Sequence, residues 1–342
     1  MGKPMSLVQI VYEQWTRLPP PLAGDLTGKT VVVVGANTGI GLEAAVHFAR
    51  MKPARLILAC RSEGRGKAAR EDIATRTGYA AELQLLDLAK FTSVKDFVSR
   101  LAGDPVDILV MNAGMAQNHY ETSEDSWEIQ LQVNHLSTAL VSILLAPNMA
   151  RAAGEHNSHS RLVVVCSGLH GAAQPEKVTP APNILHALND EQYCSKAETM
   201  DGRYNDTKLL NVLFTRAFAE HLKPSNSIIA STVNPGYCRT ELRRNLSIGM
   251  LFIMRIMDFA MGWTAEQGSR QLIWSALGPD GKDGEHVRHL HGAYVSTLEV
   301  RDPSDWVLST EGYEAQERLW HETTEVLKGI SPQVEKILKT YF

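Results

Sequence analysis

Short apolar runs alternate with longer amphipathic segments along most of the chain. Each run is rich in Val, Ile and Leu and lies between polar, Gly or Pro residues, which predicts a buried strand. The seven predicted strands are Thr30–Val34, Arg55–Cys60, Ala81–Leu86, Val106–Met111, Arg161–Cys166, Ser227–Val233 and His289–Val295. Apolar residues at helical spacing predict helices over Leu42–Met51, Gly64–Thr77, Asp125–Ala150, Tyr204–Leu222, Thr264–Leu277 and Glu311–Lys328, with another from Ser93. Continuously apolar strands separated by helices indicate an α/β fold: one doubly wound domain over residues 23–342, with a seven-stranded parallel sheet flanked by helices.

Three segments lie outside this alternation. Residues 1–22 place Leu7, Val11 and Trp15 four positions apart before three prolines, which predicts a short amphipathic helix. We expect it to lie on the domain's own surface, with contact to a membrane or a second copy as the alternative. Residues 168–203 form a long polar insertion, and residues 241–263 a Met-rich apolar flap whose flexible side chains suit a bulky apolar substrate.

Composition excludes several classes of function. The 342 residues are 44% hydrophobic and 21% charged, as is ordinary for a soluble enzyme, and the net charge of −4 gives no basic footprint for nucleic acid. No apolar run reaches the roughly 18 residues of a membrane span, and no signal peptide is evident. The four cysteines follow no paired or metal-binding spacing, and His286, His289 and His291 have no matching ligands elsewhere. We therefore expect a reduced, cytoplasmic protein without a metal.

A glycine-rich turn follows the first predicted strand. Gly35, Gly39 and Gly41 lie between that strand and an amphipathic helix, with Asn37, Thr38 and Ile40 completing the turn. Strand, tight turn and helix N-terminus are the elements with which a Rossmann-type sheet binds a dinucleotide pyrophosphate. A purely structural turn could have the same residues, so other motifs have to support this interpretation.

A tyrosine and a lysine four positions apart suggest acid–base chemistry. Tyr204 and Lys208 project from one face of a predicted helix. The pKa of a tyrosine is ordinarily about 10, and a nearby ammonium in a partly desolvated site lowers it towards 7. Ser167 follows a buried strand, where its hydroxyl could hold a substrate oxygen beside the tyrosine. A hydrolase based on Ser167 and His170 is disfavoured because no G-x-S-x-G turn surrounds the serine, and His170 is expected to line the substrate pocket.

The end of the second strand bears on the choice of cofactor. An NAD site usually has an acidic residue there for the ribose 2′-hydroxyl, whereas an arginine suits a 2′-phosphate. The chain has Arg61 and no acid at this point. This favours NADP(H) over NAD(H), with a solvated surface arginine as the alternative.

Six motifs occur together in the order and context of a known family. They are Gly35–Gly41, Asn112–Gly114, Asn134, Ser167, Tyr204–Lys208 and Pro235–Gly236. In these motifs the chain resembles the short-chain dehydrogenases/reductases, from about Thr30 to the last strand. Residues 181–190 and 303–306 resemble the retinol-dehydrogenase-like branch common in filamentous fungi.

The resemblance implies roles for individual residues. Asn134 is the fourth catalytic member, which anchors a water beside the lysine, while Tyr204 and Lys208 also contact the cofactor. The adenine is expected beside Asp87 and Leu88, and the adenosine ribose against Asn112, Ala113 and Gly114. The nicotinamide carboxamide is expected under Pro235, Gly236 and Thr240. Val34 and Met111 depart from the family pattern in the cofactor scaffold, and Tyr204 follows Ser167 by 37 positions, far more than is usual in the family.

Together these features predict an NADPH-dependent carbonyl reductase, or the reverse alcohol dehydrogenase. Its expected substrate is a hydrophobic ketone or aldehyde in a tailoring step of secondary metabolism. The alternatives are a cofactor-binding sensor or scaffold without turnover, and a multi-step enzyme with isomerase or dehydratase chemistry. A homodimer stays open.

Overall fold

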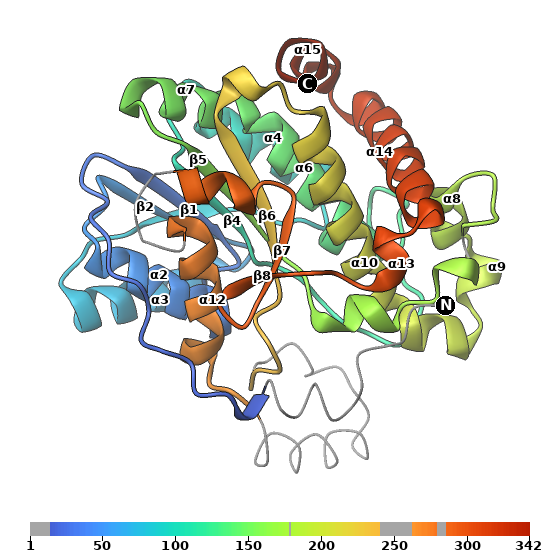
Figure 1. Cartoon of the computed structure of the whole chain (residues 1–342), viewed down its shortest axis with the longest axis horizontal. Coiled ribbons are helices and arrows are strands. Elements are labelled where there is room, and N and C mark those ends of the chain that lie inside the picture. The colour runs from blue at the N-terminus through green and yellow to red at the C-terminus, as the bar shows by residue number, and fades with distance from the viewer. Residues whose placement is uncertain (1–13, 178, 240–261, 279–284) are drawn as a thin grey trace.

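A twisted eight-stranded sheet forms the centre of the molecule (Figure 1). The computed structural model describes residues 14–177, 179–239, 262–278 and 285–342. The strand order is β3-β2-β1-β4-β5-β6-β7-β8. The strands are β1 Thr30–Val34, β2 Arg55–Cys60, β3 Glu82–Leu85, β4 Ile108–Met111, β5 Ser160–Val165, β6 Ile228–Val233, β7 Ala293–Ser296 and β8 Glu299–Arg301. The predicted α/β class is therefore correct.

The predicted strand number needs one correction. The strands from β1 to β7 are parallel, but β8 pairs antiparallel with β7 and adds an eighth strand at the edge. The two strands are joined at Thr297 and Leu298, both with positive φ, which is the backbone of a tight hairpin. All three residues of β8 are exposed, so no apolar pattern marks the strand in the sequence.

The sheet reverses its order beside β1. Val32 of β1 lies between Ile57 of β2 and Leu109 of β4, and the chain then builds outward in both directions. Between the carboxyl ends of such strands an open α/β sheet leaves the crevice in which ligands bind. The glycine-rich turn after β1 therefore lies at the edge of the sheet where a dinucleotide is expected.

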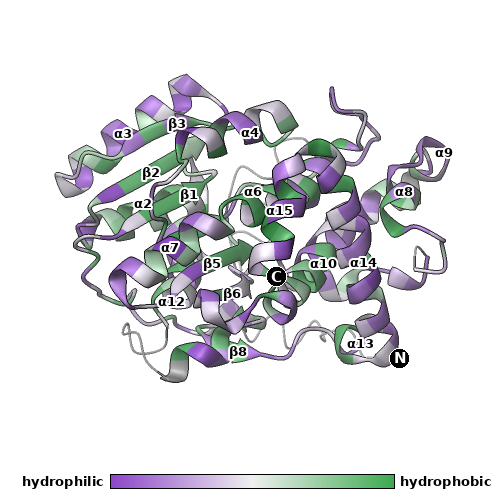
Figure 2. Ribbon diagram, turned by 90° about the horizontal axis from the view of Figure 1, so that it is seen from above, coloured by the Kyte–Doolittle hydropathy of each residue, from purple (hydrophilic) through white to green (hydrophobic). Residues whose placement is uncertain are grey.

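Helices cover both faces of the sheet, as Figure 2 shows from above. One layer contains α2 (Gly39–Arg50), α3 (Glu63–Thr77) and α12 (Ala265–Leu277); the other contains α4 (Phe91–Arg100), α6 (Ser137–Leu144), α7 (Ala146–His156) and α10 (Ala197–His221). Val31 and Val33 of β1 belong to the first core, while Val32 and Val34 belong to the second. Because successive residues of the strand face opposite layers, the strand has to be apolar throughout.

The single helix predicted over Asp125–Ala150 is broken. It consists of α5 (Ile129–Leu131), a π-helix η1 (Gln132–Leu136), α6 and α7, with Pro147 in the first turn of α7. The bend at Leu145 is 44° between Ile129–Leu144 and Ala146–His156. In the described part of the chain no single helix is long and apolar enough to span a membrane, although this bent pair matches in length and composition.

The segments between β5 and α10 and after β8 add short helices. The insertion contains two 3₁₀ turns, η2 (Gly168–Ala172) and η3 (Pro175–Lys177), followed by α8 (Ile184–Asn189) and α9 (Glu191–Cys194). The 3₁₀ turns η4 (Pro224–Asn226) and η6 (Glu285–Leu290) precede β6 and β7. At the C-terminus α13 (Asp305–Leu308) leads into α14 (Thr310–Ile330), which packs against α10, and α15 (Pro332–Tyr341) lies on α6 and α7. The apolar spacing predicts that the last helix ends at Lys328, but α14 continues to Ile330 and Pro332 begins a further helix.

Candidate active site

The glycine-rich turn is held tightly against the loop that follows β4. Gly35 has φ +80°, and a Cβ there would lie 2.8 Å from the Ala113 Cα. A Cβ on Gly41 would collide with the Gly35 carbonyl oxygen, which accepts a hydrogen bond of 3.0 Å from Asn112 Nδ2. These close approaches leave no room for a side chain at Gly35 or Gly41. Asn112 therefore has a structural role that its motif alone does not reveal.

The N-terminus of α2 fits an anionic group. Gly39 has φ +59°, and Thr38 precedes the helix without using its side chain as a cap. The first turn carries no acidic residue, so the N–H groups at the positive end of the helix dipole stay available. These features fit the pyrophosphate of a dinucleotide, which would lie across residues 37–41.

The remaining predicted cofactor residues lie beyond the carboxyl ends of neighbouring strands. Arg61 is exposed beyond β2 and forms no ion pair or hydrogen bond with another described residue. Leu88 is buried after β3, and Asp87 is half-buried, with Oδ1 accepting a 3.0 Å bond from the Ala89 N–H. Thr240 lies outside the described residues.

The Pro235–Gly236 loop packs against the N-terminal segment. Gly236 has φ +78°, and a Cβ there would collide with the Trp263 ring and lie 2.8 Å from Gln14 Nε2. Trp263 Nε1 donates to the Gln14 carbonyl at 2.8 Å, and Arg270 Nη1 donates to that of Leu18 at 3.0 Å. Residues 14–18 thus lie on the domain itself, while Leu7 and Val11 of the predicted helix fall outside the described residues, as does most of the flap.

Lys208 is buried beside Tyr204. Its Nζ lies 5.5 Å from the centre of the Tyr204 ring and donates a 2.9 Å hydrogen bond to the Val165 carbonyl at the end of β5. Burial disfavours the ammonium and lowers the pKa of Lys208 to about 8. A Cβ on Gly114 would lie 3.3 Å from Asn134 Oδ1 and 3.4 Å from Lys208 Nζ, so this glycine allows both groups to approach the β4 loop.

Asn134 joins this loop to α10. It lies in the π-helix η1 and is fully buried. Its Oδ1 accepts from the Met115 N–H at 2.8 Å, and its Nδ2 donates to the Met115 carbonyl at 2.9 Å and to Thr207 Oγ1 at 3.0 Å. A π-bulge is frequent at functional sites, and here it presents the amide to both neighbours. Thr207, between Tyr204 and Lys208 on α10, was not singled out from the sequence.

Ser167 has its hydroxyl oriented by the turn that follows it. The Oγ accepts a 3.2 Å bond from the Leu169 N–H, which leaves the hydroxyl hydrogen for an acceptor in the site. The carbonyl of Ser167 lies 2.8 Å from His170 Nδ1, and the Ser304 N–H donates to His170 Nε2 at 3.0 Å. A histidine that donates at Nδ1 and accepts at Nε2 is neutral, and burial lowers the pKa of His170 in agreement.

His170 packs inside the protein. The sequence predicts that it lines the substrate pocket, but its side chain is 4% exposed and its ring centre lies 4.8 Å from that of Tyr294. It links the end of β5 to the segment around Ser304. Within the described residues no group of three or more His, Cys, Asp or Glu could hold a metal ion.

The sheet order and the glycine-rich turn after β1 define a Rossmann-type α/β protein, and the comparisons give its family. A model described as short chain dehydrogenase matches residues 29–179. The short chain dehydrogenase/reductase dmxR8 of Cryptosporiopsis sp. (strain 8999) is 36% identical over 332 residues, covering 95% of this chain and 98% of the relative. The chain therefore belongs to the short-chain dehydrogenase/reductase family of oxidoreductases.

Solved structures share the fold. An uncharacterized protein from Mycobacterium paratuberculosis superposes with a TM-score of 0.65 at 24% identity, covering 90% of this chain and 96% of that one. L-sorbose reductase from Gluconobacter frateurii, complexed with NADPH and L-sorbose, gives 0.57 at 19% identity, covering 81% and 98%.

Proposed function

We propose that the protein is an NADPH-dependent carbonyl reductase, or the reverse alcohol dehydrogenase, acting on a hydrophobic ketone or aldehyde. The observation that carries the proposal is the buried Lys208 ammonium, 5.5 Å from the centre of the Tyr204 ring on a helix tied through Thr207 to Asn134. A buried amine is costly to the folded state, so a fold that keeps one beside a tyrosine suits a catalytic role better than a scaffold.

The cofactor assignment rests on the residues around the sheet edge. Residues 37–41 would hold the pyrophosphate and Arg61 the 2′-phosphate. Asp87 and Leu88 would contact the adenine, Asn112, Ala113 and Gly114 the adenosine ribose, and Pro235, Gly236 and Thr240 the carboxamide. The exposed guanidinium of Arg61, which pairs with no described side chain, and the lack of an acid directly after β2 support NADP(H) over NAD(H). That L-sorbose reductase binds NADPH on a similar fold agrees with this assignment.

The chain's own residues would then handle the substrate oxygen and its proton. A nicotinamide cofactor bound by these residues would supply the hydride that the carbonyl carbon receives. Ser167 donates its hydroxyl hydrogen to the carbonyl oxygen; the Leu169 N–H occupies one lone pair of its Oγ and leaves that hydrogen free to do so. Tyr204 donates the proton as charge develops on that oxygen, and the positive Lys208 stabilises the resulting phenolate. Asn134 holds the π-helix against α10 through its hydrogen bond to Thr207, which keeps Lys208 and Tyr204 in place relative to the loop after β4.

The substrate is assigned by class. The expected Met-rich wall favours a bulky apolar carbonyl compound. A tailoring step in secondary metabolism is proposed from the resemblance of residues 181–190 and 303–306 to the retinol-dehydrogenase-like branch of filamentous fungi. The direction of the reaction follows the ratio of reduced to oxidised cofactor.

A cofactor-consumption assay tests the proposal. Purified enzyme is given NADPH or NADH with a panel of apolar ketones and aldehydes, beside Tyr204→Phe as the control that keeps the ring. We expect NADPH-dependent turnover that falls at least 100-fold in Tyr204→Phe. Equal rates in the two proteins would refute the mechanism, and no turnover with any carbonyl compound or alcohol would refute the function.

A further inference from the structure

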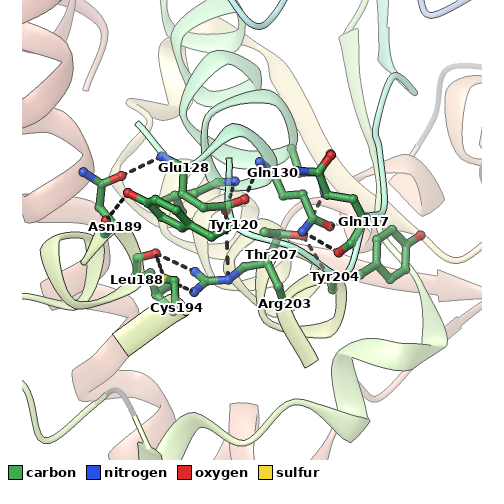
Figure 3. Close-up of polar contacts among 12 residues, drawn as sticks. Gln117, Tyr120, Glu128, Gln130, Leu188, Asn189, Cys194, Arg203, Tyr204 and Thr207 are labelled. Atoms are coloured by element: carbon green, nitrogen blue, oxygen red, sulfur yellow. Dashed lines mark hydrogen bonds and ion pairs between the residues drawn. The ribbon is translucent and has the colours of Figure 1, made fainter. Parts of the chain in front are cut away.

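A buried ion pair joins the start of α10 to the segment before α5, and the insertion after β5 is hydrogen-bonded to both partners of this pair. Arg203 directly precedes Tyr204 on α10, and Glu128 directly precedes α5 (Figure 3). Both side chains have no exposed surface, and Arg203 Nε lies 3.9 Å from Glu128 Oε2. A charge pair this deep in a protein has to be held by further hydrogen bonds, since desolvation opposes it.

Glu128 is fixed by the start of the helix that leads to Asn134. Its two carboxylate oxygens accept from the N–H groups of Gln130 at 3.0 Å and Leu131 at 2.8 Å, which caps α5. The π-helix with Asn134 follows immediately. Burial raises the pKa of Glu128, and the Arg203 charge and these N–H groups oppose the rise.

Arg203 reaches into the insertion with its other two nitrogens. Nη1 donates to the Leu188 carbonyl at 2.8 Å, and Nη2 to Cys194 Sγ at 2.9 Å. These acceptors belong to α8 and α9, and Figure 3 shows both contacts with Arg203. The backbone of Glu128 adds a third connection, because its N–H donates to Asn189 Oδ1 at 2.6 Å. Tyr120 OH donates to the Asn189 carbonyl at 3.2 Å.

The pair therefore joins three parts of the molecule at one point. These are the residue before Tyr204, the helix start before Asn134, and residues 188–194 of the insertion. Residues 184–194 of the insertion form two helices of six and four residues, which are too short to be stable without such contacts. The position of residues 184–194 therefore depends on their hydrogen bonds to Arg203 and to the backbone of Glu128.

We propose that the Arg203–Glu128 pair is a positioning device that holds the insertion beside Tyr204 and so determines how large a substrate the site accepts. The inference rests on the proposed reductase function for its kinetic readout. It assigns no contact with the reacting atoms to either residue. It also gives a role to residues 181–190, whose resemblance to the retinol-dehydrogenase-like branch does not by itself imply a function.

Three variants separate positioning from simple stabilisation. Arg203→Met and Glu128→Gln each leave one buried charge unpaired, so both should lower Tm. The double variant Arg203→Met/Glu128→Gln buries no unpaired charge and should recover most of the lost Tm. It still lacks the hydrogen bonds to Leu188 and Cys194. Arg216→Met is the matched control, because Arg216 lies on the same helix but binds Gln316 of α14 at 3.0 Å.

The readouts are kcat and KM for a small and a bulky ketone, the Kd for NADPH, and hydrogen exchange of residues 184–194. In the double variant we expect faster exchange in this segment, an unchanged Kd, and a KM for the bulky ketone that rises at least tenfold more than that for the small one. Arg216→Met should match wild type in all four. Wild-type exchange and wild-type KM values in the double variant would overturn the inference. A wild type that binds NADPH but reduces no ketone would refute the proposed function instead, and the exchange rates would then decide the inference alone.

Discussion

Replacing Lys208 by methionine should stabilise the enzyme while abolishing its activity. Lys208 is 3% exposed, and its pKa is lowered from 10.5 to about 8 by burial. At about 1.4 kcal/mol for each pKa unit, keeping this amine charged costs the folded state about 3 kcal/mol at pH 7. Methionine has a similar length and no charge. It loses the hydrogen bond to the Val165 carbonyl, which is worth about 1 kcal/mol, so the net gain is about 2 kcal/mol.

The pH dependence gives this prediction its sign. Below pH 8 the lysine is charged in both the folded and the unfolded chain, and the folded state bears the full cost. Between pH 8 and 10.5 the folded protein releases the proton while the unfolded chain keeps it, so wild-type stability rises. The advantage of Lys208→Met should therefore be complete at pH 7 and vanish near pH 10.5.

The assay is urea unfolding of the cofactor-free protein at pH 7, 9 and 10.5, with NADPH-dependent turnover measured in parallel. Lys208→Arg is the control, because it keeps a charge that does not titrate in this range. A methionine variant that is less stable than wild type at pH 7, or equally advantaged at all three pH values, would refute the reasoning.

Three further predictions follow from the same geometry. Arg61→Ala should weaken NADPH binding about tenfold and leave NADH binding unchanged, since the guanidinium would meet only the 2′-phosphate; equal losses in a fluorescence titration would contradict this. His135 is fully buried and its pKa is lowered to about 4, so protonation of the unfolded chain below pH 6.5 should cost about 3 kcal/mol of folding stability by pH 4. In denaturant titrations His135→Gln should remove that part of the acid loss, and an unchanged dependence of stability on pH would count against the prediction. His170→Phe keeps a ring against Tyr294 but loses both hydrogen bonds, so kcat should fall about tenfold, the effect of about 1.4 kcal/mol. His170→Gln can still donate and accept, so it should retain a higher kcat. Equal kcat values in the two variants would show that the hydrogen bonds do not position Ser167.

The sequence predicts those parts of the fold that depend on apolar patterning. The bounds of β1 and β2 agree with the prediction because both strands are apolar on both faces. The edge strand β8 could not be found in this way, since it is exposed and depends on two residues with positive φ. The π-helix inside the predicted long helix could not be found either, because it spans only the five residues Gln132–Leu136, too few to change the helical spacing of the apolar residues.

Contacts between distant segments are what the sequence could not give. The motifs locate Ser167, Tyr204 and Lys208, but nothing in their spacing shows that Thr207 binds Asn134. Arg203 and Glu128 meet only after α5 and α10 have packed, and each alone would be expected on the surface. An arginine directly before Tyr204, the proposed proton donor, is the one sequence feature that points to the pair.

Transfer of a label from the cofactor to the product tests the central claim most directly. The enzyme is given NADPH deuterated at C4 of the nicotinamide together with an apolar ketone that it reduces, and the alcohol is analysed by mass spectrometry and NMR. If the protein is a carbonyl reductase of the proposed kind, the product carries one deuterium on the former carbonyl carbon, and Tyr204→Phe forms almost none of it. The account would be contradicted if the alcohol contained no deuterium whichever of the two C4 hydrogens of NADPH had been replaced by deuterium.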